Sequence, residues 1–410
     1  MQTNLSPEFK DTPEGQEAEA ILRKCVHCGF CNATCPTYQL LGDELDGPRG
    51  RIYLIKQMLE GAEPTRKTQL HLDRCLTCRN CESTCPSGVQ YGALADIGRA
   101  IMERKVERGV GSKVVRWALK EGLTSPLFAP AMKLGQAMRP LLPAALQAKV
   151  PERQDAGRWP SREHVRKVLL LAGCVQPAMA PNINSATARV LDAAGIQTVV
   201  AGAAGCCGGV KFHLNDQEGG RDQMRANVDA WWPFVEHDEV EAIVMNASGC
   251  GVTVREYGHL LQHDPAYAAK ARRISALTCD LSEMLPMLVQ ALQGKVQPGV
   301  GLLAFHPPCT LQHGQQLRGG VERFLGELGF RVSRAPAESH LCCGSAGTYS
   351  VLHPGMAKQL RDRKLGHLAR LEPQAIISAN IGCITHLQSG TTTPVRHWIE
   401  VLDEALRPAA

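Results

Sequence analysis

Eight cysteines near the amino terminus have the spacing of metal ligands, because they form two copies of one pattern. Each copy reads C-x2-C-x2-C-x3-C-P, with Cys25, Cys28, Cys31 and Cys35 before Pro36, and Cys75, Cys78, Cys81 and Cys85 before Pro86. In such a run three thiolates hold one iron–sulfur cluster and the fourth ligates the other cluster. The spacing therefore predicts two [4Fe–4S] clusters with crossed ligand sets: Cys25, Cys28, Cys31 and Cys85 for the first, and Cys75, Cys78, Cys81 and Cys35 for the second.

A pair of zinc sites is the alternative, since four thiolates also make a structural zinc site. Zinc does not require the fourth cysteine and the proline at this spacing, whereas proteins with two iron–sulfur clusters use that run. Disulfides are a poor explanation for 17 cysteines in a protein that we expect to stay inside the cell, where thiols are kept reduced. We therefore expect iron and sulfide at these eight residues.

The second half of the chain holds nine more cysteines, and eight of them recur in register about 135 residues apart. The first set is Cys174, Cys206, Cys207 and Cys250, and the second is Cys309, Cys342, Cys343 and Cys383. The repeat predicts a duplicated domain and makes the two sets candidates for additional metal sites. Buried structural thiols are the other interpretation, because free cysteine is commonly buried. Cys279 has no counterpart and is expected to be an ordinary thiol.

The elements that must position these cysteines follow from the hydrophobic pattern. Short apolar runs predict strands near residues 167–171, 197–200 and 242–245 in the first repeat, and near 302–305, 331–333 and 375–378 in the second. Helical patterns alternate with these runs, which indicates parallel sheets with flanking helices. Because the cysteines follow the strands, we expect them to gather at the carboxyl edge of each sheet.

The amino-terminal part is predicted to be mainly helical, with helices near residues 48–61 and 93–106. Arg49 and Arg51 either lie near the charge of a cluster or form a solvated helix start. Histidines near the cysteines of the second repeat, among them His306, are expected to be hydrogen-bonded structural residues, because imidazole ligation of iron–sulfur clusters is uncommon.

The predicted architecture is α+β and multidomain: a mainly helical ferredoxin-like domain, followed by two duplicated α/β cysteine-rich domains. The expected boundaries are residues 1–16 for a flexible start, 17–110 for the helical domain with two clusters, 111–164 for a basic linker broken by prolines, 165–294 for the first repeat and 295–410 for the second.

Composition limits the function. The chain has 410 residues, is 44% hydrophobic and carries a net charge of +5, which excludes general disorder and gives no sign of a nucleic-acid partner. Its polar start predicts no signal peptide, and no apolar run reaches 18 residues, so we expect a cytoplasmic protein without a membrane span. Residues 99–167 contain 15 basic and 6 acidic side chains. We expect that segment either to lie on the cytoplasmic face of the inner membrane or to pack against a partner subunit.

The paired runs followed by two Cys-Cys-Gly repeats resemble iron–sulfur subunits that share the cysteine-rich domain of heterodisulfide reductases. Segments 28–31, 35–38, 47–51 and 75–81 look like the family of bacterial glycolate oxidase iron–sulfur subunits, over nearly the whole chain. The resemblance implies two [4Fe–4S] clusters that relay electrons from a flavin-binding partner, which oxidises glycolate or D-lactate, towards a membrane acceptor such as quinone. Related glycerol-3-phosphate or lactate dehydrogenases are alternatives.

The sequence departs from the wider family at Ala247 and Asn380, where the repeat usually carries a fifth cysteine that helps to hold a noncubane cluster. Four thiolates per repeat leave room for one or two further iron–sulfur clusters. A thiol or disulfide reductase acting through these repeats is a further alternative. No strand-borne G-x-G-x-x-G and no P-loop occur, so the substrate chemistry is expected on another chain.

Overall fold

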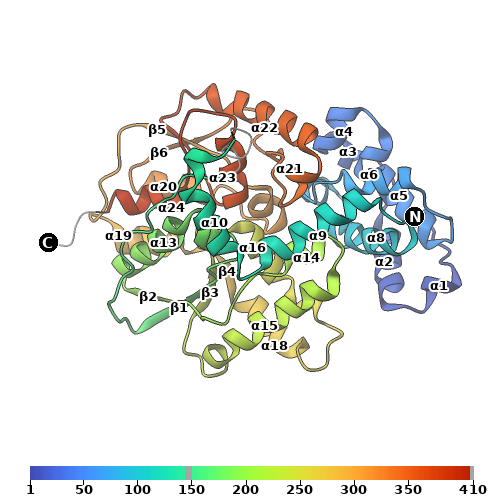
Figure 1. Cartoon of the computed structure of the whole chain (residues 1–410), viewed down its shortest axis with the longest axis horizontal. Coiled ribbons are helices and arrows are strands. Elements are labelled where there is room, and N and C mark those ends of the chain that lie inside the picture. Colours follow the sequence, from blue (N-terminus) through green and yellow to red (C-terminus); the bar gives the residue numbers. More distant parts are fainter. Residues whose placement is uncertain (144–149, 407–410) are drawn as a thin grey trace.

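The computed structural model describes residues 1–143 and 150–406; residues 144–149 of the predicted linker and 407–410 of the second repeat lie outside them. The amino-terminal helices lie at one end of the molecule and the two sheets towards the other (Figure 1). These helical elements are α1 (Pro7–Lys10), α2 (Pro13–Lys24), α3 (Phe30–Ala33), α4 (Pro36–Leu41), the 3-10 turn η1 (Glu44–Asp46), α5 (Pro48–Leu59), α6 (Arg66–Asp73), α7 (Asn80–Thr84) and α8 (Tyr91–Lys105).

Helices α2, α5 and α8 form the core of this end, because each turns an apolar face inward. Leu22, Ile55 and Leu94 from the three helices are fully buried in one hydrophobic cluster. Helices α5 and α8 pack so closely that a Cβ at Gly98 would lie 2.6 Å from Ile55 Cγ1. The predicted helices near 48–61 and 93–106 are thus present with slightly different ends, and together they support the cysteine loops.

The first repeat is a four-stranded parallel sheet of order β2-β1-β3-β4 with helices on its faces. Its elements are β1 (Arg166–Leu170), α12 (Gln176–Met179), α13 (Pro181–Ala193), β2 (Ile196–Val199), α14 (Gly209–His213), α15 (Gln217–Glu236), β3 (Ala242–Met245), α16 (Ser248–Arg255), α17 (Tyr257–Leu260), α18 (Ala268–Leu277), β4 (Thr278–Asp280), the 3-10 turn η3 (Leu281–Met284) and α19 (Leu285–Leu292).

The second repeat has the same topology, with the parallel order β6-β5-β7-β8. Its elements are β5 (Leu302–Phe305), the π-helical turn η4 (Thr310–Gly314), α20 (Gly320–Glu327), β6 (Arg331–Arg334), α21 (Tyr349–Leu352), α22 (Pro354–Ala369), β7 (Ala375–Ser378), α23 (Ile381–Gln388), β8 (Val395–His397) and α24 (Trp398–Glu404). The fold class expected from the sequence is therefore confirmed: α+β and multidomain, with a helical ferredoxin-type part before two cysteine-rich repeats.

The two repeats share one hydrophobic core. Helix α13 packs against α24, and α19 packs against α20, so that buried side chains such as Val190 and Trp398 belong to a single cluster. The carboxyl ends of the sheets also meet, because Ser248 N donates a 3.1 Å hydrogen bond to Ala379 O. The six predicted strands match the observed ones to within one residue at each end, whereas the three-residue strands β4 and β8 were not predicted from the sequence.

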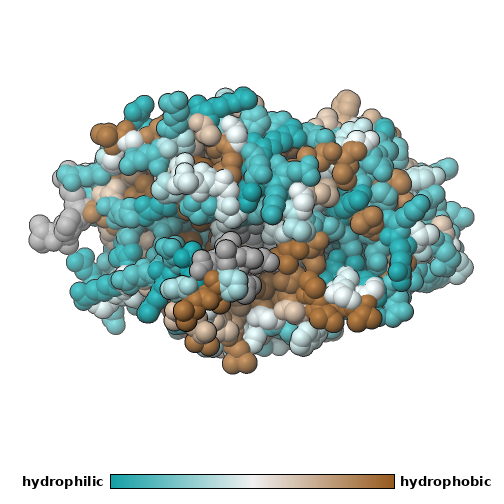
Figure 2. Space-filling model, turned by 45° about the horizontal axis from the view of Figure 1, so that its top comes forward, coloured by the Kyte–Doolittle hydropathy of each residue, from teal (hydrophilic) through white to brown (hydrophobic). Residues whose placement is uncertain are grey.

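The basic segment before β1 contains α9 (Val110–Thr124), α10 (Phe128–Ala137) and the 3-10 turn η2 (Arg139–Leu141). Helix α9 ends before Pro126, as the prolines predict. Large apolar side chains on these elements or directly beside them are exposed: Val110, Val114, Val115, Trp117, Leu127, Leu134, Met138 and Leu141. Hydrophobic patches interrupt the largely hydrophilic face of the molecule in Figure 2. None of the described helices is both long enough and apolar enough to cross a bilayer.

Candidate metal centres

The two amino-terminal cysteine loops fold alike. His27 and Gly29 in the first loop have φ of 59° and 87°, and the residues 50 positions later, Thr77 and Arg79, have φ of 52° and 58°. These left-handed residues flank Cys28 in the first loop and Cys78 in the second, and they curl the chain around each of these thiols. A short helix, α3 or α7, then carries the third cysteine, and the fourth cysteine precedes a proline.

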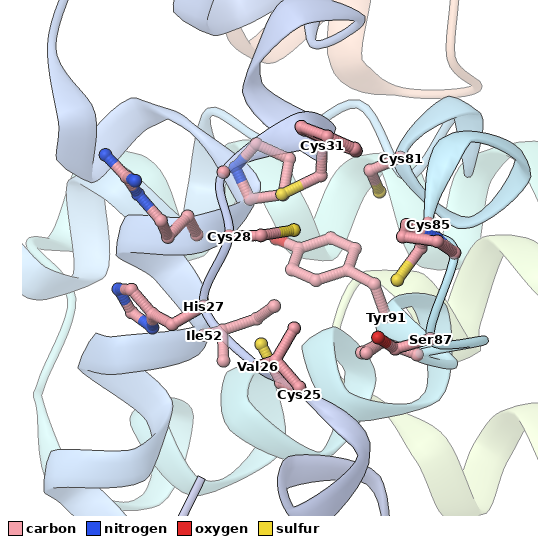
Figure 3. A pocket seen from close by; sticks show the side chains of 16 residues that line it. Cys25, Val26, His27, Cys28, Cys31, Ile52, Cys81, Cys85, Ser87 and Tyr91 are labelled. Atoms are coloured by element: carbon pink, nitrogen blue, oxygen red, sulfur yellow. The ribbon is translucent and has the colours of Figure 1, made fainter.

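The first loop opens on a small hollow. Cysteines from both runs line it: Cys25, Cys28, Cys31, Cys81 and Cys85. In Figure 3 the sulfur atoms of Cys25, Cys28, Cys31 and Cys85 lie around one shared space. Burial, together with the neighbouring sulfur of Cys25, raises the pKa of the Cys31 thiol to about 11. Free thiols crowded in this way resist ionisation, so a cation at their centre would stabilise the thiolates.

The second loop lines an adjacent small hollow, together with the last cysteine of the first run. Its sulfur-bearing residues are Cys35, Cys75, Cys78 and Cys81. Cys81 and Tyr91 border both hollows, so the two sites are neighbours. The structure thus brings together each of the two crossed sets that the sequence predicts, although ligation itself stays a prediction.

The two sites differ in exposure and charge. Cys28 is exposed beside the first hollow, whereas Arg51 is fully buried beside the second. Arg51 Nη1 lies 4.0 Å from Cys35 Sγ and donates to Thr37 Oγ1 at 3.0 Å, and Arg51 Nη2 pairs with Asp46 at 3.4 Å. Burial acts to raise the pKa of Cys75, yet the charges of Arg51 and Arg99 outweigh it and lower that pKa.

The alternative that Arg51 belongs to a solvated helix start is therefore wrong, because its side chain is only 1% exposed. Its guanidinium is instead held beside the sulfurs of the second site. Arg49 is one-third exposed and pairs with Glu44 at 2.6 Å. It also borders the first hollow.

The Cys-Cys-Gly motif has the same backbone in both repeats. Gly208 and Gly344 have φ of 89° and 90°, and a Cβ there would lie 2.6 Å from Gly220 O and 2.5 Å from Ala357 O, respectively. Only glycine fits such a close approach in a left-handed conformation. The motif thereby fixes the turn that aims the paired thiols at the carboxyl edge of each sheet.

The four cysteines of each repeat do gather, as the topology predicts. In the first repeat Cys206 lies next to Cys174 and Cys207 next to Cys250. In the second, Cys309 Sγ lies 3.8 Å from Cys342 Sγ, and Cys343 neighbours Cys383.

The second set also approaches the amino-terminal sites. Cys309, Cys342 and Leu76 share a hydrophobic cluster, and Cys78 packs against it. Cys309 and Cys342 of the second repeat therefore lie beside the second hollow.

One histidine differs from the expectation that these residues are hydrogen-bonded. His313 is satisfied, with Nδ1 3.0 Å from Ser83 Oγ and Nε2 2.8 Å from His340 O. His306, in contrast, is 1% exposed and neither ring nitrogen has a hydrogen-bond partner. The sequence signal was the spacing His306-Pro-Pro-Cys309, which puts an imidazole three residues before a thiol.

Thiolate donors at the two hollows suit iron–sulfur chemistry, since four cysteines per site is the usual ligand number for a [4Fe–4S] cluster. Both hollows are bordered mainly by sulfur and apolar groups, with a buried cation only at the second. The residues present therefore fit two such clusters.

Comparison with known proteins gives the same result. A model of a 4Fe-4S dicluster domain matches residues 21–89, and a model of a cysteine-rich domain matches residues 168–255 and 303–388. The glycolate oxidase iron-sulfur subunit of Escherichia coli strain K12 is 54% identical over 99% of both chains. This chain belongs to the family of glycolate oxidase iron–sulfur subunits.

Other relatives are more distant. A probable glycolate oxidase iron-sulfur subunit of Bacillus subtilis strain 168 is 28% identical over 94% of this chain and 92% of its own length. Lactate utilization protein A of Geobacillus kaustophilus is 26% identical, but the match covers 58% of this chain and 98% of that protein. Membership of the family makes this chain an iron–sulfur protein and a subunit of an oxidoreductase complex.

Proposed function

We propose that this chain relays electrons in a glycolate-oxidising complex, from a flavin-binding partner that makes glyoxylate towards a membrane acceptor such as quinone. The crossed sets Cys25, Cys28, Cys31, Cys85 and Cys75, Cys78, Cys81, Cys35 would each hold a [4Fe–4S] cluster. Such clusters accept and release single electrons when bound. The observation that carries the proposal is the adjacency of two sulfur-lined hollows, which meet at Cys81 and Tyr91.

The arrangement of the residues supports a direction. The first hollow reaches the surface at Cys28, and Val26 and Phe30 beside it are exposed. The second hollow lies deeper, with Cys78 packed against Cys309 and Cys342 of the second repeat. An electron donor can therefore dock at the first site, while the second site faces the interior of the chain.

The contact between the second loop and the first repeat is held by charge. Arg79, the residue after Cys78, pairs through both terminal nitrogens with Glu256, and Arg79 Nη2 lies 2.9 Å from Glu256 Oε2. His213 Nδ1 lies 3.1 Å from Asp96 Oδ1 across the same boundary. These pairs fix the cysteine loop against the repeats, which a relay between sites requires.

Partner binding is supported by the exposed apolar side chains of α9, α10 and η2, including Trp117 at 63% and Leu141 at 81% exposure. We propose that this surface meets either the flavin-binding subunit or the cytoplasmic face of the inner membrane, the two alternatives that the sequence leaves open. The two cysteine sets of the repeats stay our candidates for further iron–sulfur clusters: Cys174, Cys206, Cys207 and Cys250 in the first repeat, and Cys309, Cys342, Cys343 and Cys383 in the second.

A complex that oxidises lactate is the second candidate, because a lactate utilization protein matches more than half of this chain. The test uses the complex purified without oxygen, with its partner subunits attached. Glycolate should reduce the clusters, as a loss of visible absorbance and a gain of electron paramagnetic resonance signal, faster than D-lactate or glycerol-3-phosphate does. No reduction by glycolate, with dithionite still effective, would contradict the proposal.

A further inference from the structure

Tyr91, the first residue of α8, borders both amino-terminal hollows. In Figure 3 its ring lies among the sulfur atoms of the first hollow. The residue is only 4% exposed and packs in the hydrophobic cluster of the amino-terminal helices. Its backbone is also held, because Tyr91 N donates to Val89 O at 2.9 Å. Tyr91 is therefore a fixed side chain in contact with both sites.

The hydroxyl of Tyr91 is a buried donor without an acceptor. It makes no hydrogen bond to any part of the chain that the structure describes. Such a state is costly, since the hydroxyl has given up its hydrogen bonds to water and gained none in return. The cysteine sulfurs that line the second hollow beside it are acceptors, most strongly when they are thiolates. The hydroxyl therefore indicates an interaction with sulfur at this site.

The other buried tyrosines show that this state is exceptional. Three tyrosines are buried within the described ranges: Tyr91, Tyr257 and Tyr349. Tyr257 Oη donates to Cys207 O at 2.9 Å, and Tyr349 Oη donates to Met356 Sδ at 3.5 Å. Both of these hydroxyls have an acceptor within the chain, whereas the one beside the two hollows does not.

Cys75 is the cysteine that acts most strongly on this hydroxyl. Tyr91 and Cys75 both line the second hollow. Burial raises the pKa of the Tyr91 phenol well above its usual value, and the charge of Cys75 raises it further. The phenol therefore keeps its proton and stays a hydrogen-bond donor beside the sulfur of Cys75.

Cys75 also carries negative charge more readily than two other cysteines of its site. Burial raises the pKa of Cys78 and that of Cys81 well above the ordinary value. At Cys75 burial acts in the same direction, but the cations of Arg51 and Arg99 outweigh it and lower the pKa. A thiolate accepts a hydrogen bond more strongly than a neutral thiol does.

We infer that Tyr91 Oη donates a hydrogen bond to Cys75 Sγ when the second site holds its cluster, and that this bond raises the reduction potential there. The inference rests on the proposed electron relay. Reduction adds negative charge that is shared by the sulfur ligands, and hydrogen bonds to these sulfurs then become stronger. The hydroxyl thus stabilises the reduced state of the second site and favours passage of an electron from the first site to the second.

The test is a redox titration of the full chain, purified without oxygen with its clusters in place and followed by electron paramagnetic resonance. Tyr91→Phe keeps the ring and removes the hydroxyl. Reduction of the second cluster should become about tenfold less favourable, which is about 59 mV for a one-electron couple, and reduction of the first should change by less than about twofold. Cys78→Ser, which removes the second cluster, identifies its signal in the parent.

Tyr349→Phe is the matched control. Tyr349 is also buried and belongs to the hydrophobic cluster against which Cys78 packs, but its hydroxyl already has Met356 as an acceptor. The second cluster of this variant should titrate as in the parent. An equal shift in Tyr349→Phe, or no shift in folded, cluster-loaded Tyr91→Phe, would overturn the inference.

A second measurement reports on the hydrogen bond in the parent protein itself. After long incubation in heavy water, pulsed electron paramagnetic resonance of the reduced second cluster should detect an exchangeable deuteron that Tyr91→Phe lacks. A parent without such a deuteron, or a variant that retains it, would also overturn the inference. The relay is judged separately, by iron and sulfide content and by reduction with glycolate, because chemical mediators set the potential in the titration whatever the substrate is.

Discussion

Replacing Arg51 with methionine should lower the reduction potential of the second cluster selectively. The guanidinium is buried, and Nη1 lies 4.0 Å from Cys35 Sγ. Reduction adds a negative charge, which this cation stabilises. Removal of the cation therefore makes reduction less favourable, and the potential becomes more negative.

The size of the shift follows from Coulomb's law. For an electron on a bound cluster at about 7 Å from the guanidinium, an effective dielectric constant of about 20 gives an interaction of about 2.4 kcal/mol. For a one-electron couple this corresponds to about 100 mV. The first cluster is farther from Arg51 and should shift by much less.

The assay is a redox titration of the anaerobic protein followed by electron paramagnetic resonance. Arg51→Lys should keep most of the potential, because the charge stays. Arg51→Met combined with Asp46→Asn should recover part of the shift, since the buried carboxylate partner at 3.4 Å is neutralised too. A potential of the second cluster that stays within about 20 mV of the parent in folded, cluster-loaded Arg51→Met would refute the electrostatic reasoning.

Three other outcomes are expected. Cys78→Ser should remove the second cluster and lower iron and sulfide by about four each per chain, and electron flow from glycolate to an artificial quinone should fall at least tenfold; unchanged turnover would argue against a relay. Glu256→Gln should weaken the docking of Arg79 and lower the free energy of unfolding by about 1–2 kcal/mol in urea titrations, whereas an unaltered midpoint would show that the pair is dispensable. Burial acts to lower the pKa of His213, but the charge of Asp96 outweighs burial and raises that pKa. The pair therefore stabilises the fold at pH below about 6.5, and this stabilisation is lost as the pH rises through the raised pKa. The stability difference between pH 6 and pH 8 should accordingly shrink in His213→Gln, and an identical difference would count against the pair.

Much of this architecture was predictable from the sequence, because short apolar runs that recur in register in both repeats are unlikely to be accidental. The strands at Ala242–Met245 and Ala375–Ser378 stand out as apolar runs in register with each other. Strands β4 and β8 escaped prediction because each has three residues, too few to show a period. Their pairing depends on the neighbouring strand, as in Asp280 beside Met245.

The site was predictable only in part, for a physical reason. Cysteine spacing encodes which thiols share a loop, and it indicated both crossed sets. The burial of Arg51 and the unpaired state of His306 depend on residues that are distant in the chain, such as His71, whose carbonyl accepts from Arg51 Nε, and Cys383, which lies near His306. Composition and local pattern carry no information about those contacts.

The most direct test of the central claim is the iron and acid-labile sulfide content of the chain purified without oxygen, compared between the parent, Cys28→Ser and Cys279→Ser. Eight amino-terminal thiolates holding two clusters predict about eight iron and eight sulfide in the parent and in Cys279→Ser, and about four of each in Cys28→Ser, with any cluster in the two repeats adding equally to all three. A folded, colourless parent protein that carries zinc alone and still supports turnover of its complex would contradict the account.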